Sequence, residues 1–174
     1  MIVKLITALM FIFSINVIAS PDQIDVIGLK PGVTTVQEFH SAGKIYGNSS
    51  GIFEIGGYRL ICAGEFKNNL LDAFFCKTGG KLNKDTNTQI HETLKTGFNT
   101  KFGSPDKDTN ESVRTRIGVE YQSNEVLWVD SKGNALILKS MSGKIDEGEI
   151  VMYSDKRMQL IKNEAEQKEL SRKF

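Results

Sequence analysis

The sequence predicts an α+β fold in which two helix-then-antiparallel-meander units pack in layers, followed by a C-terminal helix. Three observations predict it. A helix-start signal stands near the beginning of each half of the chain. Each helix signal is followed by short stretches of alternating apolar and polar residues, separated by turn residues. The residues from 154 onward are rich in charge and carry only a thin apolar stripe.

Residues 1–19 have the layout of a secretory signal peptide. The stretch MIVKLITALMFIFSINVIAS has one cation, Lys4, then an apolar run, and small residues suit cleavage after Ala19. The alternative is a single membrane anchor, but the run from Leu5 to Phe13 is short for a bilayer, which needs about 20 residues. We therefore expect a periplasmic or secreted protein with no stable membrane insertion after cleavage.

Cleavage would leave about 155 residues, which fits one compact domain or two small repeats. We expect a first unit at 20–80, a second at 81–153, and a charged helix or tail at 154–174. Loss of Lys4 leaves 21 basic and 21 acidic residues. Because nucleic-acid binding needs a basic stripe, this balance predicts no nucleic-acid partner.

The stretch VIGLKPGVTTVQEF, at residues 26–39, predicts a short helix that starts abruptly. A capping box is available from Thr34 with Gln37 or from Thr35 with Glu38. Gly32 permits a sharp turn before it, and the helix is expected to stop by residue 43.

Residues 58–77 predict a β-hairpin whose turn is Lys67-Asn68-Asn69. Its two cysteines, Cys62 and Cys76, share even parity, so an even register places both on one face and close enough to bond. An exported chain meets an oxidising compartment, which favours a disulfide; the alternative is two buried free thiols.

A second helix is predicted after Asp85 or Thr86, with an apolar residue every fourth position from Ile90 to Phe102 and an end at Gly103. A polar loop at 106–111 is expected next, then one strand at 113–121. A hairpin turning at 130–134 and a last strand at 149–153 complete the second meander. The tail beyond Ser154 is expected to be a solvated helix; the alternative is a partner-binding helix.

Two short motifs, GLKPGVTTVQEF and GSP, carry a resemblance to a known family. The residues Gly32-Val33-Thr34 resemble the Gly-hydrophobic-Thr start of the helix in periplasmic domains of the SmpA/OmlA outer-membrane assembly lipoprotein family. Gly103-Ser104-Pro105 resembles the family's Gly-x-Pro element, although here the two motifs lie in different halves. A tandem pair of such units is similar to the β-lactamase inhibitor protein fold. The resemblance implies helix-plus-sheet repeats that bind another protein, and it carries over no functional residues.

Catalytic and metal-binding patterns are weak. His40 and His91 are the only histidines, and position 95, where a zinc-protease helix needs its second histidine, is Lys95. We therefore expect no catalytic residues, no metal and no cofactor.

Five residues are the candidate partner contacts, because Tyr, Trp and Arg dominate interface energetics. They are Tyr46, Tyr58, Arg114, Arg116 and Trp128. The alternative for the strand aromatics is core packing.

The sequence thus predicts an exported non-catalytic module that binds an envelope or secreted protein through sheet faces and loops, such as an inhibitor, an immunity factor or an assembly helper. The alternative is a small secreted hydrolase or ligand-binding module with a pocket between the two units.

Overall fold

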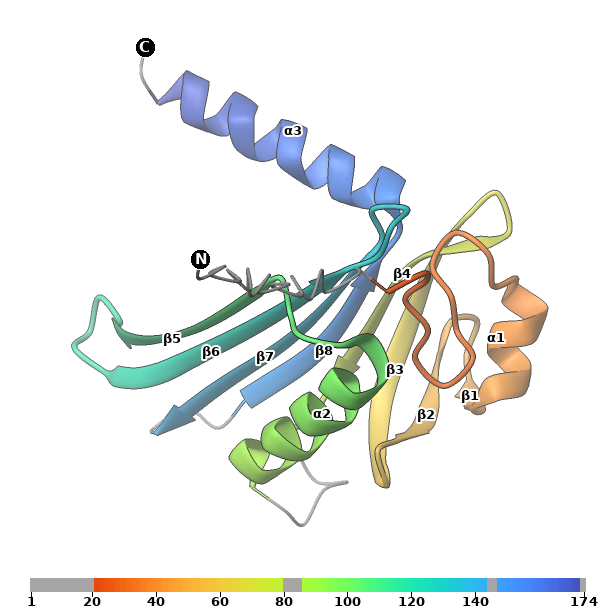
Figure 1. The fold of residues 1–174 in the computed structure, drawn as a ribbon, viewed down its shortest axis with the longest axis horizontal. Coiled ribbons are helices and arrows are strands. Elements are labelled where there is room, and N and C mark those ends of the chain that lie inside the picture. The colour runs from red at the N-terminus through yellow and green to blue at the C-terminus, as the bar shows by residue number, and fades with distance from the viewer. Residues whose placement is uncertain (1–20, 80–85, 144–146, 173–174) are drawn as a thin grey trace, which may run out of the picture.

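The structure is a computed structural model that describes residues 21–79, 86–143 and 147–172 (Figure 1). The expected signal peptide at 1–19 lies outside the described residues, as does most of the segment between the two predicted units. The described residues form eight strands and three helices. The strands are β1 (Lys44–Tyr46), β2 (Ser50–Ile55), β3 (Tyr58–Lys67), β4 (Leu70–Lys77), β5 (Lys107–Arg114), β6 (Glu120–Val129), β7 (Ala135–Gly143) and β8 (Glu147–Tyr153). The helices are α1 (Val36–Ala42), α2 (Asn87–Phe102) and α3 (Asp155–Ser171).

All eight strands belong to one antiparallel sheet, so the predicted α+β class is confirmed. The strand order is β1-β2-β3-β4-β8-β7-β6-β5. In the chain, α1 precedes β1–β4 and α2 precedes β5–β8. The two groups of four strands join where β4 pairs with β8, from Ala73 opposite Tyr153 to Lys77 opposite Glu149.

The first helix begins at the capping box of Thr35 and Glu38, one of the two boxes that the sequence offered. The Thr35 backbone N–H donates to Glu38 Oε2 at 2.7 Å, and the Glu38 N–H donates to Thr35 Oγ1 at 3.3 Å. The Thr35 N–H and hydroxyl both donate to the Glu38 carboxylate, and these two hydrogen bonds to its charged form lower the pKa of Glu38. The neighbouring Thr34 hydroxyl accepts instead from the Lys30 N–H at 2.8 Å and closes the preceding turn.

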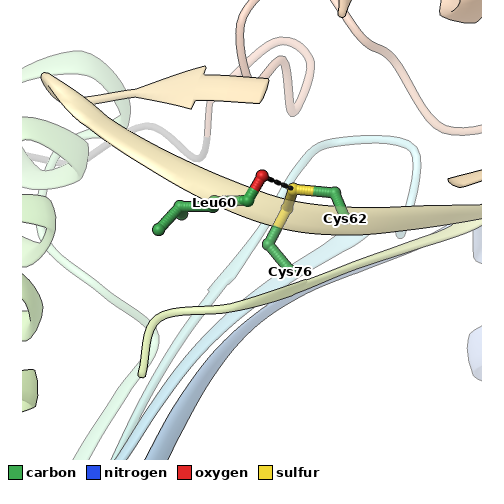
Figure 2. Close-up of a disulfide and its surroundings, with 3 residues drawn as sticks. All are labelled: Leu60, Cys62 and Cys76. Carbon is green, nitrogen blue, oxygen red and sulfur yellow. Dashed lines mark hydrogen bonds between the residues drawn. A yellow bond between two sulfur atoms is a disulfide. The ribbon is translucent and has the colours of Figure 1, made fainter. Parts of the chain in front are cut away.

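The β3–β4 hairpin and its disulfide are as the sequence predicts. Asn68 and Asn69 form the turn with φ of 53° and 64°, a left-handed conformation that asparagine tolerates better than most residues. Cys62 and Cys76 stand directly opposite each other and are bonded (Figure 2). The Leu60 carbonyl oxygen lies 3.8 Å from Cys62 Sγ, but a disulfide sulfur carries no proton, so this is a packing contact.

The second helix, α2, has Thr86 as its N-cap and ends at Gly103, whose φ is 82°. Its predicted apolar stripe is confirmed, because Ile90, Leu94, Phe98 and Phe102 are all buried. The four-residue spacing places these side chains on one side of the helix, which therefore packs against the sheet.

The strand prediction between the second helix and residue 121 was wrong. Residues 107–114, expected to be mostly a polar loop, form the edge strand β5, and the expected strand at 113–121 is divided by a turn. The Gly118 N–H donates to the Thr115 carbonyl at 2.9 Å, and the Val119 N–H donates to Thr115 Oγ1 at 3.0 Å. An edge strand with both faces largely exposed shows no apolar alternation, so the pattern gave no signal for β5. The sequence prediction also omitted β1 and β2, whose short glycine-rich segment was not assigned to strands.

The second predicted hairpin, β6–β7, turns at residues 130–134 as expected. Asp130 organises the turn, because its Oδ1 accepts from the N–H groups of Lys132 at 2.9 Å and Asn134 at 3.0 Å. Its Oδ2 accepts from the Ile24 N–H at 2.9 Å and so fastens the N-terminal segment to the same turn. The last strand, β8, begins at Glu147, two residues before the sequence predicts.

Both α1 and α2 cover the same face of the sheet. Phe74, Met152, Leu136 and Trp128 are successive partners across β4, β8, β7 and β6, so their side chains share one face. Phe39 of α1 packs on Phe74, with ring centroids 6.0 Å apart. At the other end of this row, Phe98 of α2 packs on Trp128 at 5.7 Å. The main core therefore lies between this face and the two helices.

The third helix, α3, leaves the sheet and runs away from it (Figure 1). Its N-cap, Ser154, lies beside a bulge in β4 at Asp72. The Ser154 N–H donates to the Asp72 carbonyl, and the Ser154 hydroxyl donates to the Asp72 carboxylate. None of its described residues is buried. In the described part of the chain, no helix combines the length and apolar character needed to cross a bilayer.

Candidate protein-binding surface

The face of the sheet that points away from α1 and α2 is the candidate site, and we call it the open face. Along β3, the side chains of Leu60 and Cys62 enter the core, so those of Arg59, Ile61 and Ala63 point to the opposite side. Among the described helices, only the first turns of α3 reach the open face, where Arg157 lies 3.4 Å from Glu65 of β3. Most of this face is therefore free of the helices that the structure describes.

The pairing register arranges the open face into two rows that cross the whole sheet. The first, which we call the mixed row, consists of Lys44, Ile52, Ile61, Lys77, Glu149, Lys139, Glu125 and Thr109. The second, which we call the apolar row, consists of Tyr46, Ser50, Ala63, Phe75, Val151, Ile137, Leu127 and Lys107. Six of the eight members of the apolar row are apolar or aromatic, and five of them, from Ala63 to Leu127, are consecutive, so the open face carries an apolar band.

The exposure of this band is uneven. Val151, at its centre, is only 3 % exposed because neighbouring side chains cover it. Beside it, Phe75 packs edge-on against Tyr153 with ring centroids 5.8 Å apart. Burial there raises the pKa of Tyr153, and the nearby Glu149 adds to the effect. Toward β1, by contrast, Tyr46 is 47 % exposed and Ile61 is 49 % exposed.

The charges of the open face are also uneven. In the β5–β8 half, Glu125 lies 3.5 Å from both Lys139 and Lys107. In the β1–β4 half, Lys44, Arg59 and Lys77 have no carboxylate within 4.0 Å among the described residues. Glu54 stands opposite Arg59 in the register but does not approach it that closely.

A pocket of about 400 Å³ lies where β4, β8 and β7 meet. Lys77, Lys139, Met141, Glu147 and Glu149 contribute to its walls. Its lining combines lysine and glutamate side chains, which can hold a small polar ligand.

The five predicted partner contacts do not form one surface. Tyr46 lies on the open face. Tyr58 points to the opposite side, where its hydroxyl donates to Thr93 of α2 at 3.2 Å. Arg114 and Arg116 lie at the exposed tip between β5 and β6, and Arg116 is in the turn rather than on a strand.

The expectation for Trp128 as a partner contact was wrong. Its side chain is 0 % exposed, and its indole Nε1–H donates to the Gly103 carbonyl at 3.1 Å. Because Trp128 fills the space between β6 and the end of α2, core packing accounts for it.

His91 is the most unusual titratable group. It is 2 % exposed, and its Nε2 has no hydrogen-bond partner among the described residues. Burial lowers the pKa of His91, while Glu92, whose carboxylate lies 3.6 Å from Nδ1, opposes that shift. In the described part of the chain, no three His, Cys, Asp or Glu side chains gather in a way that would hold a metal ion.

Comparison of the chain with protein-family models, with curated proteins and with solved structures finds no match. The resemblance to tandem SmpA/OmlA-like units and to the β-lactamase inhibitor protein therefore stays a hypothesis that rests on the quoted motifs.

The sequence reasoning missed the residues that dominate the exposed half of the open face, chiefly Ile61, Ile52, Lys44 and Lys77. A signal for Ile61 was present. Once Cys62 is assigned to the core, the alternation of a strand places Ile61 and Arg59 on the other face. No comparable signal existed for Lys44 and Ile52, because β1 and β2 were not predicted.

Proposed function

We propose that this protein is an exported, non-catalytic module that binds an envelope or secreted protein through the open face of its sheet. One observation carries the proposal: both sheet-covering helices lie on one face, while the other displays the apolar row with exposed Tyr46 and, in the neighbouring mixed row, exposed Ile61. Exposed apolar patches rimmed by polar residues are typical of protein-binding sites. An inhibitor, an immunity factor and an assembly helper would all work in this way.

Export to the periplasm or beyond is supported by two features. Residues 1–19 carry the charge, apolar run and small residues of a signal peptide. The Cys62–Cys76 disulfide is of a kind that persists in oxidising compartments and is rare in the cytosol.

A two-unit organisation is part of the proposal. The order of elements supports it, since one helix and four antiparallel strands occur twice in the chain. In this view the units at 20–80 and 81–153 join through the β4–β8 pairing, and their open faces form one surface. The C-terminal segment, 154–174, would then project beside that surface.

The test is an affinity capture with residues 20–174 against envelope and secreted proteins of the same source. Ile61→Arg places a charge at the exposed apolar side chain between Ile52 and the apolar row, and we expect it to abolish capture of a saturable partner. Ile117→Arg is the matched control, because Ile117 is 87 % exposed at the β5–β6 turn, away from the open face. It should leave capture unchanged.

Circular dichroism would first establish that both variants fold. The absence of any saturable partner, or capture that survives Ile61→Arg, would contradict the proposal.

A second candidate function is a small-ligand-binding module or hydrolase, as the sequence also allowed. The pocket between β4, β8 and β7 favours it, because this is where the two strand groups meet. Its charged lining suits a polar ligand. Loss of small-molecule binding in Lys77→Ala, with protein capture intact, would favour this candidate over the first.

A further inference from the structure

We propose that the β1–β4 half of the open face is the docking site for an acidic protein segment, one that presents an apolar side chain flanked by carboxylates. The inference rests on the proposed function above, and it adds the location and the chemistry of the partner. It follows from three features of the open face: exposed apolar area, unpaired cations and the position of α3.

The apolar centre of this site is formed by adjacent side chains. Ile52 and Ile61 are directly opposite each other on β2 and β3, and Ala63 is opposite Phe75 on β3 and β4. Opposed side chains in an antiparallel pair lie in contact distance, so these residues form one patch. Tyr46, two strands from Ala63, extends it toward the sheet edge. Ile61 and Tyr46 leave about half of their surface in water, which a partner would remove.

Three cations surround the patch. Lys44 and Lys77 lie at the two ends of the short row Lys44–Ile52–Ile61–Lys77, and Arg59 precedes Ile61 on the same face of β3. Two acidic side chains are their neighbours in the register, Glu54 opposite Arg59 and Glu149 opposite Lys77. None of the three cations has a carboxylate within 4.0 Å in the described part of the chain. The local excess of positive charge would attract carboxylates and repel a basic partner.

The other half of the open face differs on the same points. Its lysines Lys107 and Lys139 already contact Glu125, so a partner would have to replace existing ion pairs. Of the apolar side chains there, Val151 is buried at 3 % exposure and Leu127 and Ile137 are partly exposed, whereas the most exposed ones, Tyr46 and Ile61, lie in the β1–β4 half. The β1–β4 half is therefore the half whose charges and apolar groups are left for a partner.

A protein segment fits this site better than a flat anionic bilayer. The first turn of α3 rises from the same face, where Arg157 contacts Glu65 of β3. The helix then runs away from the sheet (Figure 1), so it projects from the face that a flat surface would have to approach. A narrow segment can reach the patch beside α3, whereas a planar surface would meet the helix first.

The experiment uses residues 20–174 with the disulfide intact and a phage-displayed library of random dodecapeptides as the probe. Selected peptides are sequenced, and the most enriched one is synthesised for titration. We expect enrichment of large apolar residues with Asp or Glu nearby. The double variant Lys44→Glu/Lys77→Glu should weaken binding at least tenfold, and Ile61→Arg should abolish it. Lys132→Glu/Lys156→Glu, on exposed lysines outside the patch, is the matched control and should stay within twofold of the unmodified chain.

Several results would overturn the inference. Selected peptides without an excess of acidic residues, or a peptide affinity unchanged by Lys44→Glu/Lys77→Glu, would exclude an acidic partner. Binding that survives Ile61→Arg but is lost in Lys139→Gln would move the site to the β5–β8 half. No peptide enrichment would also count against it. Binding to phosphatidylglycerol vesicles that Lys44→Glu/Lys77→Glu abolishes would assign the patch to a bilayer.

These failures are distinct from failure of the proposed function. If a captured protein partner is lost in Ile61→Arg while the charge variants have no effect, the open face binds protein but the acidic chemistry is wrong. If capture survives Ile61→Arg, the open face itself is not the binding surface.

Discussion

The two halves of the open face belong to one sheet but differ in the ion pairing of their cations and in the exposure of their apolar side chains. In the β5–β8 half, Lys107 and Lys139 share Glu125, and Val151 is covered. In the β1–β4 half, Lys44 and Lys77 have no such partner among the described residues, and the apolar groups between them face water. The comparison indicates that the lysines of one half are paired within the sheet, while the cations and the most exposed apolar side chains of the other half are left for a partner.

The halves also differ in what holds them together. Under α1, Phe39 packs on Phe53, Phe66 and Phe74, with ring centroids 5.0 to 6.0 Å apart. A disulfide in β3–β4 adds a covalent link, while the edge strand β1 has only three residues. The half with the exposed patch thus carries a covalent cross-link that the β5–β8 half, which has no cysteine, lacks.

The largest expected effects test whether the halves are energetically separate. Phe74→Ala and Trp128→Ala remove buried aromatics from the first and second halves, and each should cost about 3–5 kcal/mol. Because β4 and β8 join the halves into one sheet, urea unfolding followed by circular dichroism should show a single transition shifted in both variants. Two resolved transitions would show that the halves unfold independently.

Removal of the disulfide should act mainly on the first half. The Cys62→Ala/Cys76→Ala variant opens a loop of sequence separation 14 and should lose about 3 kcal/mol of folding free energy. Hydrogen exchange should rise more in β2 and β3 than in β6 and β7. A uniform rise across the sheet would argue that the disulfide does not stabilise one half preferentially.

The free energy of unfolding should depend on pH because of His91, which lies on α2 in the second half. Its folded pKa is lowered from 6.5 by burial, so the unfolded chain binds the proton more readily. The stabilising contribution is present above about pH 6.5 and is lost as the pH falls toward the folded pKa. Denaturant midpoints measured between pH 7.5 and 5 should show this fall, and His91→Gln should flatten it. His40→Gln, at an exposed position of α1, is the control; a fall that persists in His91→Gln would exclude His91 as its source.

The capping box of α1 gives a smaller effect in the first half. Thr35→Ala removes the hydroxyl that accepts from the Glu38 N–H and should cost about 1 kcal/mol, measured by thermal or urea unfolding. Thr35→Ser keeps the hydroxyl and should retain most of the stability. Equal losses in both variants would show that the cap hydroxyl is not the source.

The smallest expected effect on the free energy of unfolding comes from the surface charges. Lys139→Gln breaks an exposed ion pair with Glu125 and should cost a few tenths of a kcal/mol, up to about 1 kcal/mol. Lys44→Gln breaks no such pair and should leave the free energy of unfolding unchanged. A loss in Lys44→Gln equal to that in Lys139→Gln would remove the contrast between the two halves.

The parts of the fold that the sequence could predict are those with strong local patterns. The Thr35 cap, the stripe of α2 and the Asn68-Asn69 turn depend on nearby residues, and each formed as the pattern indicates. The edge strand β5 could not be predicted, because a strand with two largely exposed faces has no apolar alternation to detect.

The open face was harder to predict for a physical reason. Its two rows exist only because β4 pairs with β8, and that pairing joins residues far apart in the chain. The burial of Trp128 likewise depends on α2 covering β6, which no local pattern reports. Tyr46 is a candidate contact that the sequence named and that the structure places on the exposed half of the open face.

The most direct test of the central claim is lysine footprinting of the protein bound to its captured partner. Acetylation of each lysine is measured by mass spectrometry in the free and bound states. If the β1–β4 half is the docking site, Lys44 and Lys77 should be protected on binding, while Lys107 and Lys139 should label as they do in the free protein. Protection of Lys107 and Lys139 with Lys44 and Lys77 unchanged would contradict the account.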